Sequence, residues 1–595
     1  MAAAPRPVPA AFLIAILGLG AAVTTDVVPG VFSVDDNNYL INVLALREGR
    51  VTVPQTDGLR PSPELLFFDP GPWTRTVTST PVASTAPPLY APIALPFSLF
   101  GWRGLVALNT IAYLATAVMV FVFVNRRSSA ELTPWLAAAA FALGGFGIEY
   151  AEGLWPHSLS VALCTAGLLA AVRAGEAGAA RWAGVAGFLI ALAAGVRYQN
   201  ALILAAAALW LAIRFPRRKT LAAFVLAAAL PLAASSTINQ ARHGSWNPIS
   251  KGRGYLTVPV PGGGDRSITE PVVMFWSRLV DYSTRPPLTS RAFAEWLKYD
   301  PQTGAHIMPG GVIKKAMLQS APWAVLGFAM LVLAWGRAAW TSRAIRPPLL
   351  LFSLVTAAVL GAFAFSGAGR DDGWSYNQRY LLELVPIAAI AFAWSVDEAG
   401  LRWRPIGVGA IGGAALLAAT LMAPDTGVRF VGLMKVPLVL AASTAAIWAL
   451  FRTGHLSSRR SVLSGAIGLC LGWALALHLA QDLQASHRAK RYHLAQTAAL
   501  SPVLTDGSAL VAYWGHKDSA TPLLFDRDLV ILDARADEGK DAPLLIGDLL
   551  NRGRRVFVLE DGFPPDVLRQ VVGGFQFQPV RHGSLRLLAL PASDR

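Results

Sequence analysis

The sequence predicts a polytopic α-helical membrane protein with about thirteen transmembrane helices and a small α/β domain at its C-terminal end. Three features predict this class: the composition, a series of long apolar runs, and a change of pattern near residue 485. Of the 595 residues, 54% are hydrophobic and only 15% are charged. A soluble protein of this length could not bury so much apolar surface in one core.

The apolar runs define the predicted spans. A helix needs about 20 residues to cross the hydrocarbon core of a bilayer, and some of the runs are only just long enough. They lie at 10–28, 104–124, 134–150, 157–173, 182–197, 200–214, 220–237, 318–336, 347–366, 380–396, 405–422, 432–451 and 462–481. We expect the first run to remain as an uncleaved span, because the charge pattern of the later loops requires it.

The charges in the loops predict the orientation. With the N-terminus in the cytoplasm, every loop on that side is basic, as the positive-inside rule requires. Examples are Arg126 and Arg127, Arg217 and Arg218, and Arg459. An odd number of crossings then puts the C-terminal domain in the periplasm, and we expect the inner membrane of a bacterium. The net charge of +15 is explained by topology, so we expect no nucleic-acid partner.

Three long segments fall on the external side. Residues 29–103 and 238–317 are large external loops of a transmembrane domain that spans 1–484, and residues 485–595 form the third segment. The spacing of apolar residues over 39–46 predicts an interfacial helix, and the short proline-containing stretch at 86–102 predicts a dip into the interface. In the tail, strands are predicted at 509–513, 529–532 and 555–559, with helices at 544–551 and 564–572. This alternation predicts an α/β domain, which has no phosphate-loop pattern and to which we assign no chemistry.

Polar and aromatic side chains gather at the external ends of the predicted spans. Since these ends lie near one plane, we expect the side chains to form a site for an anionic lipid head group and a polar partner. No spacing requires a metal, although a divalent cation at Asp35, Asp36 and Glu152 is left open, and we predict no metal and no cofactor. The candidates are Asp35, Asp36, Tyr39, Glu152, His157, Arg197, Tyr198, Gln199, Lys251, Arg253, Arg379 and Tyr380.

Five motifs, in their order and on their side of the membrane, resemble the GT-C class of membrane glycosyltransferases, near the protein O-mannosyltransferases and the lipid A aminoarabinose transferases. The acidic pair Asp35-Asp36 followed by Tyr39 matches the pair after the first span of those families. The others are Pro-Pro-Leu-Tyr at 87–90, Trp-Pro-His at 155–157, a shortened Gly-to-Arg-Tyr element at 195–198, and Gly-Trp-Ser-Tyr-x-x-Arg-Tyr-Leu at 373–381. The resemblance covers residues 1 to about 480 and leaves out the tail.

The resemblance implies a GT-C-like fold and an inverting glycosyltransferase, hexosyl or pentosyl, that moves a sugar from a polyprenyl-phosphate donor to an acceptor hydroxyl. The acceptor would be a glycan, a lipid or a protein. The implied catalytic base is Asp35, with Asp36 a close second, because a carboxylate can take the acceptor proton. Cations would hold the departing phosphate, with Arg379 and Arg197 first and Lys251 and Arg253 in reserve. The implied substrate-binding residues are Tyr39, Glu152, His157, Tyr198, Gln199 and Tyr380.

Each of these residues also has a structural explanation. Asp35 and Asp36 could cap the helix that follows them. Arg379 could pair with Asp371 or Asp372, and Arg197 could extend from its span to reach water.

Three other functions fit the sequence less well. A transporter or flippase of lipid-linked sugars would place ionisable residues near mid-span and repeat broken helices, whereas the charges here lie at span ends. A polymerase or ligase of lipid-linked glycans would place its large external loop late in the chain, and this chain has one directly after the first span. A simple membrane anchor would not need so many spans.

Overall fold

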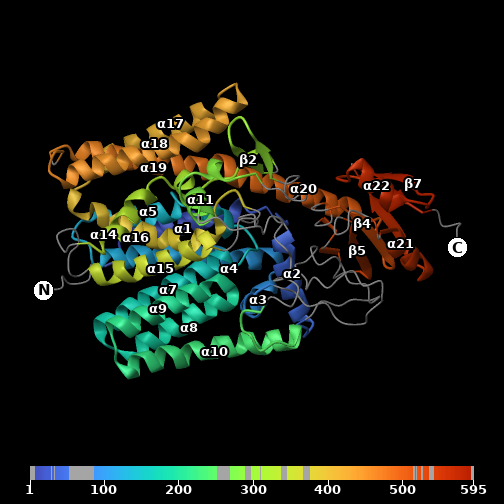
Figure 1. The fold of residues 1–595 in the computed structure, drawn as a ribbon, viewed down its shortest axis with the longest axis horizontal. Helices are drawn as coiled ribbons and strands as arrows, with labels where there is room; N and C mark the ends of the chain where they lie inside the picture. The colour runs from blue at the N-terminus through green and yellow to red at the C-terminus, as the bar shows by residue number, and fades with distance from the viewer. Residues whose placement is uncertain are drawn as a thin grey trace.

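The structure is a computed structural model in which a long helical bundle is followed by a small α/β domain (Figure 1). It describes residues 7–28, 30–32, 34–51, 86–250, 269–287, 297–308, 310–336, 345–365, 375–456, 458–513, 516, 519–520, 522–523, 527–534, 540, 542–583 and 585–590. The helices of the first half are α1 Ala10–Thr25, α2 Val34–Arg47, α3 Tyr90–Ser98, α4 Gly101–Asn125, α5 Leu132–Ala142, α6 Ile148–Ala151, α7 His157–Ala177, α8 Ala180–Val196, α9 Ala201–Arg214, α10 Arg218–His243 and α11 Thr269–Leu279.

The second half continues the bundle and then leaves it. Its helices are α13 Met317–Ser320, α14 Ala324–Leu333, α15 Arg346–Phe365, α16 Val385–Val396, α17 Trp403–Leu421, α18 Thr426–Arg452, α19 Arg460–Leu477 and α20 Gln484–Leu500. Short 3₁₀ turns are η1 Tyr198–Asn200, η2 Tyr282–Thr284, η4 Arg379–Leu384 and η5 Asp397–Ala399, and η6 His478–Leu483 is a π-helical turn. A small antiparallel sheet joins β1 Lys298–Asp300, β2 Ala305–Met308 and β3 Val312–Ile313.

The chain is a multi-pass membrane protein. In the described part of the chain, seven helices are long and apolar enough to cross a membrane: α4, α7, α10, α15, α17, α18 and the continuous helix Arg460–Leu500. The other predicted runs coincide with the shorter apolar helices α1, α5, α8, α9, α14 and α16. Large apolar side chains on the outside of the bundle, such as Leu17, Leu226 and Ile411, are more than 70% exposed, as lipid-facing residues are.

Two glycine pairs let α17 and α19 pack with their backbones in contact. Gly409 and Gly413 lie four residues apart on α17, and Gly468 and Gly472 lie four apart on α19. A Cβ atom at Gly472 would stand 1.9 Å from the carbonyl oxygen of Ala410, and one at Gly413 would stand 2.2 Å from that of Leu469. Small residues at this spacing are the usual way for membrane helices to approach closely, because van der Waals packing is what holds them together in lipid.

The elements that follow α1 cover one end of the bundle. The stretch in which an interfacial helix was predicted forms the helix α2, and the stretch that was expected to dip into the interface contains the nine-residue helix α3. The Arg242 guanidinium at the end of α10 holds both, donating to Asn42 Oδ1 at 3.0 Å and to the carbonyl oxygen of Ala86 at 3.0 Å.

The C-terminal domain is a five-stranded sheet in the order β5-β4-β6-β8-β7. Its elements are β4 Ser508–Ala512, β5 Leu529–Asp533, α21 Ala542–Asn551, β6 Arg555–Leu559, α22 Pro565–Val572, β7 Gln578–His582 and β8 Leu585–Ala589. The three predicted strands and two predicted helices are confirmed, and the β7–β8 hairpin is additional. Along β4, Ala509 and Val511 pack in the cluster that contains α21 and α22 residues, and Leu510 and Ala512 pack in a cluster with Leu500 of α20.

We predict that Gly472→Ala lowers the thermal stability of the purified protein in detergent. The added methyl group cannot fit against the Ala410 carbonyl, so the two helices must separate, and overpacking of this kind costs about 1–3 kcal/mol. Gly465→Ala on the same helix is the control, because its Cβ atom would meet only the Pro405 oxygen, at 3.9 Å. Equal melting temperatures for the two variants would contradict the packing described here.

Candidate active site

The candidate site lies at one end of the bundle, where the segment before α2, the turn around α6, the segment before η4 and the helix α20 meet. Aromatic rings connect these segments. The Phe32 ring lies 5.5 Å from the ring of Trp155 and 5.5 Å from that of Tyr376, measured between centroids, with edge-to-face geometry in both pairs. Residues from three distant parts of the chain are therefore in one cluster.

Asp36 is buried at the start of α2, with 2% of its surface exposed. Its Oδ2 accepts a hydrogen bond from the backbone N–H of Phe32 at 2.8 Å. The carboxylate thus pairs with a backbone donor just before α2 begins, which is related to the capping role that the sequence also allowed. Asp35 belongs to the same turn of α2, but its side chain lies outside the described residues. Tyr39, one turn further along, packs edge-to-face on Tyr90 at 5.3 Å.

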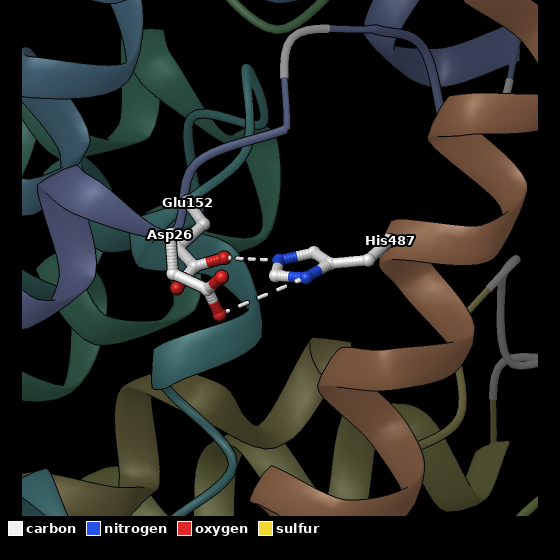
Figure 2. A group of neighbouring side chains, drawn as sticks. All are labelled: Asp26, Glu152 and His487. Atoms are coloured by element: carbon white, nitrogen blue, oxygen red, sulfur yellow. Dashed lines mark hydrogen bonds and ion pairs between the residues drawn. The ribbon is translucent and has the colours of Figure 1, made fainter.

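Glu152 and His487 form a buried pair beside this helix (Figure 2). The Nε2 atom of His487 is 2.7 Å from Glu152 Oε2, and its Nδ1 atom is 3.8 Å from Asp26 Oδ2. Figure 2 shows the imidazole of α20 pointing at both carboxylates, one nitrogen toward each. The main chain is held as well, because the Lys490 ammonium donates to the carbonyl oxygen of Glu152 at 2.8 Å.

Asp26, Glu152 and His487 also offer oxygen and nitrogen ligands within 4.8 Å of one another, which is the donor set of a divalent cation. Two ligands of one ion, each about 2.1 Å from it, stand about 3 Å apart or more. The 2.7 Å contact between His487 and Glu152 is shorter than that. Direct pairing of the imidazole with the carboxylates therefore accounts for this cluster.

A second buried network lies next to the first. The Asn377 amide donates to Glu149 Oε2 at 3.3 Å and to Asp482 Oδ2 at 2.9 Å. The other oxygen of Asp482 forms an ion pair with the Lys315 ammonium at 2.7 Å, and both side chains are almost fully buried. The π turn η6 carries Asp482, and such turns are frequent at functional sites because they redirect a side chain.

Several buried polar atoms of the segment 149–157 have no hydrogen-bond partner among the described residues. They are Glu149 Oε1, the Tyr150 hydroxyl oxygen, Trp155 Nε1 and both ring nitrogens of His157. The His157 ring stacks on Tyr150 at 4.8 Å and lies 5.3 Å from the Trp155 ring. Native proteins pair more than 90% of their buried polar groups, so a group of unpaired ones in one place indicates a site that a polar ligand fills.

The Arg379 guanidinium borders this group. Its central carbon lies 5.2 Å from the centre of the Trp155 ring and 5.0 Å from that of Tyr380, and its Nη2 donates to the Tyr380 hydroxyl at 3.1 Å. Tyr380 is in turn stacked on Phe363 at 5.3 Å. The cation is thus held between aromatic rings, an arrangement typical of guanidinium groups.

Arg197 has a different environment. Its Nη1 donates to Glu383 Oε1 at 2.6 Å, and its Nη2 donates to Gln199 Oε1 at 3.2 Å. Gln199 also donates to Glu383 Oε2 at 3.0 Å, so Arg197, Gln199 and Glu383 form one buried unit. Tyr198 points elsewhere, with its hydroxyl donating to the carbonyl oxygen of Ser250 at 2.9 Å.

Lys251 and Arg253 lie outside the described residues. The structure brings Asp36, Glu152, His157 and Arg379 into one region of the molecule. The structure also places in this region six residues that were not among the predicted site residues: Glu149, Lys315, Glu383, Asp482, His487 and Lys490. A sequence signal existed for the last three, because polar residues follow the last apolar run, at Asp482, His487 and Lys490.

Glu149 gives a prediction about pH. It lies outside the candidate spans, and burial, together with the Asp482 carboxylate, raises its pKa from 4.5 to about 8. The folded protein therefore keeps a proton on Glu149 that the unfolded chain loses, and this contribution to stability disappears as the pH rises from about 4.5 through about 8. We predict that Glu149→Gln flattens the fall of melting temperature across this interval. An unchanged pH dependence in the variant would contradict the assignment.

Comparisons with known proteins agree on the fold. No family model and no curated protein matches the sequence. The crystal structure of ArnT from Cupriavidus metallidurans in the apo state matches over 98% of this chain and 98% of its own, with a TM-score of 0.52 and 14% identity. ArnT bound to undecaprenyl phosphate matches over 98% and 99%, with the same TM-score and identity.

The cryo-EM structure of the arabinofuranosyltransferase AftD from Mycobacteria matches over 99% of this chain and 42% of its own, with 15% identity, but its TM-score of 0.44 is too low to support an argument. The ArnT structures align with this chain over almost the whole length of both. The chain therefore has the fold of the GT-C class of membrane glycosyltransferases.

Proposed function

We propose that this protein is an inverting glycosyltransferase that moves a sugar from a polyprenyl-phosphate donor to an acceptor hydroxyl on the outer face of a bacterial inner membrane. The observation that carries the proposal is the group of unpaired buried polar atoms of Glu149, Trp155 and His157 beside the Arg379 guanidinium. A sugar phosphate supplies hydroxyl groups as partners for these polar atoms, and a phosphate anion as a partner for the guanidinium of Arg379. The fold supports the proposal, since ArnT, which shares it, was crystallised with undecaprenyl phosphate.

The chemistry needs few groups. The acceptor oxygen attacks the anomeric carbon while the bond from that carbon to the phosphate oxygen breaks, and the polyprenyl phosphate leaves with the electron pair. The acceptor proton passes to a carboxylate, for which we propose Asp35. Asp36 is the close alternative, but its Oδ2 already accepts from the backbone of Phe32. Arg379 stabilises the charge that develops on the phosphate.

Arg197 and the remaining candidates receive supporting roles in this proposal. Because Glu383 and Gln199 occupy the Arg197 guanidinium, we propose that Arg197 positions the η4 segment that carries Arg379. It also donates to the carbonyl oxygen of Arg379 itself, at 3.3 Å. Lys251 and Arg253 remain proposed reserve ligands of the phosphate, and Tyr39, Glu152, His157, Tyr198 and Tyr380 remain proposed contacts of the sugar or acceptor. We propose no cofactor.

Replacement of the base should separate catalysis from binding. We predict that Asp35→Asn lowers kcat by about 10²–10⁴-fold, because the amide cannot take the acceptor proton, while the Kd for undecaprenyl phosphate is unchanged. Transfer is measured with radiolabelled sugars on defined polyprenyl phosphates and a detergent extract of cell envelopes as acceptor. Glu48→Gln, an exposed carboxylate just beyond the end of the same helix, is the control.

Full activity of Asp35→Asn together with loss of activity in Asp36→Asn would move the base to Asp36. Wild-type protein that neither binds undecaprenyl phosphate nor transfers any of the sugars would contradict the proposed function.

Replacement of the anion ligand should act on binding. We predict that Arg379→Gln raises the Kd for undecaprenyl phosphate by tenfold or more, since a charge-assisted hydrogen bond contributes about 1.5–3 kcal/mol. Binding is measured by competition with a fluorescent polyprenyl phosphate in detergent micelles. Arg103→Gln is the matched control, because Arg103 is an exposed arginine at the start of α4. Equal affinities for the two variants would exclude Arg379 as a phosphate ligand.

A further inference from the structure

The helix α20 links the candidate site to the C-terminal domain. It continues α19 and η6 as one helical run, Arg460–Leu500, and Figure 1 shows this run leaving the bundle for the α/β domain. At its far end, Leu500 is fully buried in the cluster that also contains Leu510 and Leu587 of the sheet. A helix that is packed at both ends has little freedom to rotate, so the side chains between them are fixed in direction.

Lys490 lies midway along α20 and is buried at the site, with 3% of its surface exposed. The segment before α2 packs against its backbone. Gly30 has a φ of +145°, and a Cβ atom there would stand 2.9 Å from the Lys490 carbonyl oxygen, so a larger residue at position 30 would push α20 away. The contact of α20 with the site is therefore a close-packed one.

The ammonium group of Lys490 faces an acidic environment. Asp36, Glu152 and Glu149 all act on it electrostatically, and its one hydrogen bond among the described residues goes to the carbonyl oxygen of Glu152. A buried carboxylate is costly unless a cation is close, and the Lys490 ammonium is a cation that acts on the carboxylates of Asp36 and Glu152. An ammonium has three N–H donors, so Lys490 can serve the carboxylates and the main chain together.

We propose that Lys490 is a positioning residue of the transfer site, supplied by the helix that carries the C-terminal domain. It fixes the Glu152 main chain and places a positive charge near the carboxylate of Asp36, the neighbour of the proposed base in α2. The proposal rests on the proposed function. It gives the C-terminal domain a part in catalysis, because the packing of the domain on α20 fixes where Lys490 stands.

The experiment uses the full-length protein with three substitutions of Lys490. Lys490→Gln retains a donor for the Glu152 carbonyl oxygen but removes the charge, Lys490→Met removes both, and Lys490→Arg retains both. We expect kcat to fall tenfold or more in Lys490→Gln and Lys490→Met and to be largely retained in Lys490→Arg. The Kd for undecaprenyl phosphate should be unchanged in all three variants. Arg491→Gln, an exposed cation on the same helix, should behave as wild type.

The pH–rate profile provides a readout that a purely structural role would not change. Loss of the ammonium makes the carboxylates harder to ionise, so the acidic limb of the profile should move to higher pH in Lys490→Gln. The charged and titratable groups that face this cluster from the surrounding elements are Asp26, Asp36, Glu149, Glu152, Lys315, Asp482 and His487. All of them are retained in the variant.

Two results would overturn the proposal. The first is a wild-type kcat and pH profile for Lys490→Gln. This result overturns the proposal even if the Lys490→Met variant does not fold. The second is a raised Kd with an unchanged kcat, which would make Lys490 a ligand of the phosphate. Failure of the wild-type protein to bind undecaprenyl phosphate is a separate outcome, which overturns the proposed function and this inference with it.

Discussion

Pairing of buried polar and charged groups at one end of the bundle is the constraint on which the rest of the structure depends. An ionised group taken out of water costs several kcal/mol unless a partner of opposite charge is close. Glu383 has the Arg197 guanidinium at 2.6 Å and Asp482 has the Lys315 ammonium at 2.7 Å, while the carboxylate of Glu152 pairs with the imidazole of His487 at 2.7 Å. Each pair joins elements that are far apart in the chain, so the pairs fix the loops around the site as well as neutralising its charges.

The helices supply the rigid frame for these pairs. Close backbone contact at Gly413 and Gly472 holds α17 against α19, and α19 continues into the helix that carries Asp482, His487 and Lys490. Among the described residues of the same region, the segment 149–157 carries several buried polar atoms that lack a hydrogen-bond partner. Within the described residues there, a substrate can therefore form hydrogen bonds without first breaking those of the protein, which favours binding.

Much of the fold could be predicted from the sequence, and less of the site. Every predicted apolar run coincides with a helix, and the strands and helices of the C-terminal domain were found because their patterns alternate strongly. The β7–β8 hairpin was missed because Gln578–His582 is exposed throughout and has no apolar alternation. The motifs drew attention to Asp36, His157 and Arg379, and Glu152 was selected among the polar residues at span ends. Lys490 belongs to no motif, and the ion pair of Arg197 with Glu383 depends on packing between helices.

The sequence by itself determined the membrane class and the positions of the helices, because hydropathy acts locally along the chain. Only the tertiary structure decided which charged groups meet. Glu152 and His487 are 335 residues apart, and Arg197 and Glu383 are 186 apart. Such pairings depend on how the helices pack in three dimensions, and a local pattern carries no information about a partner at that distance.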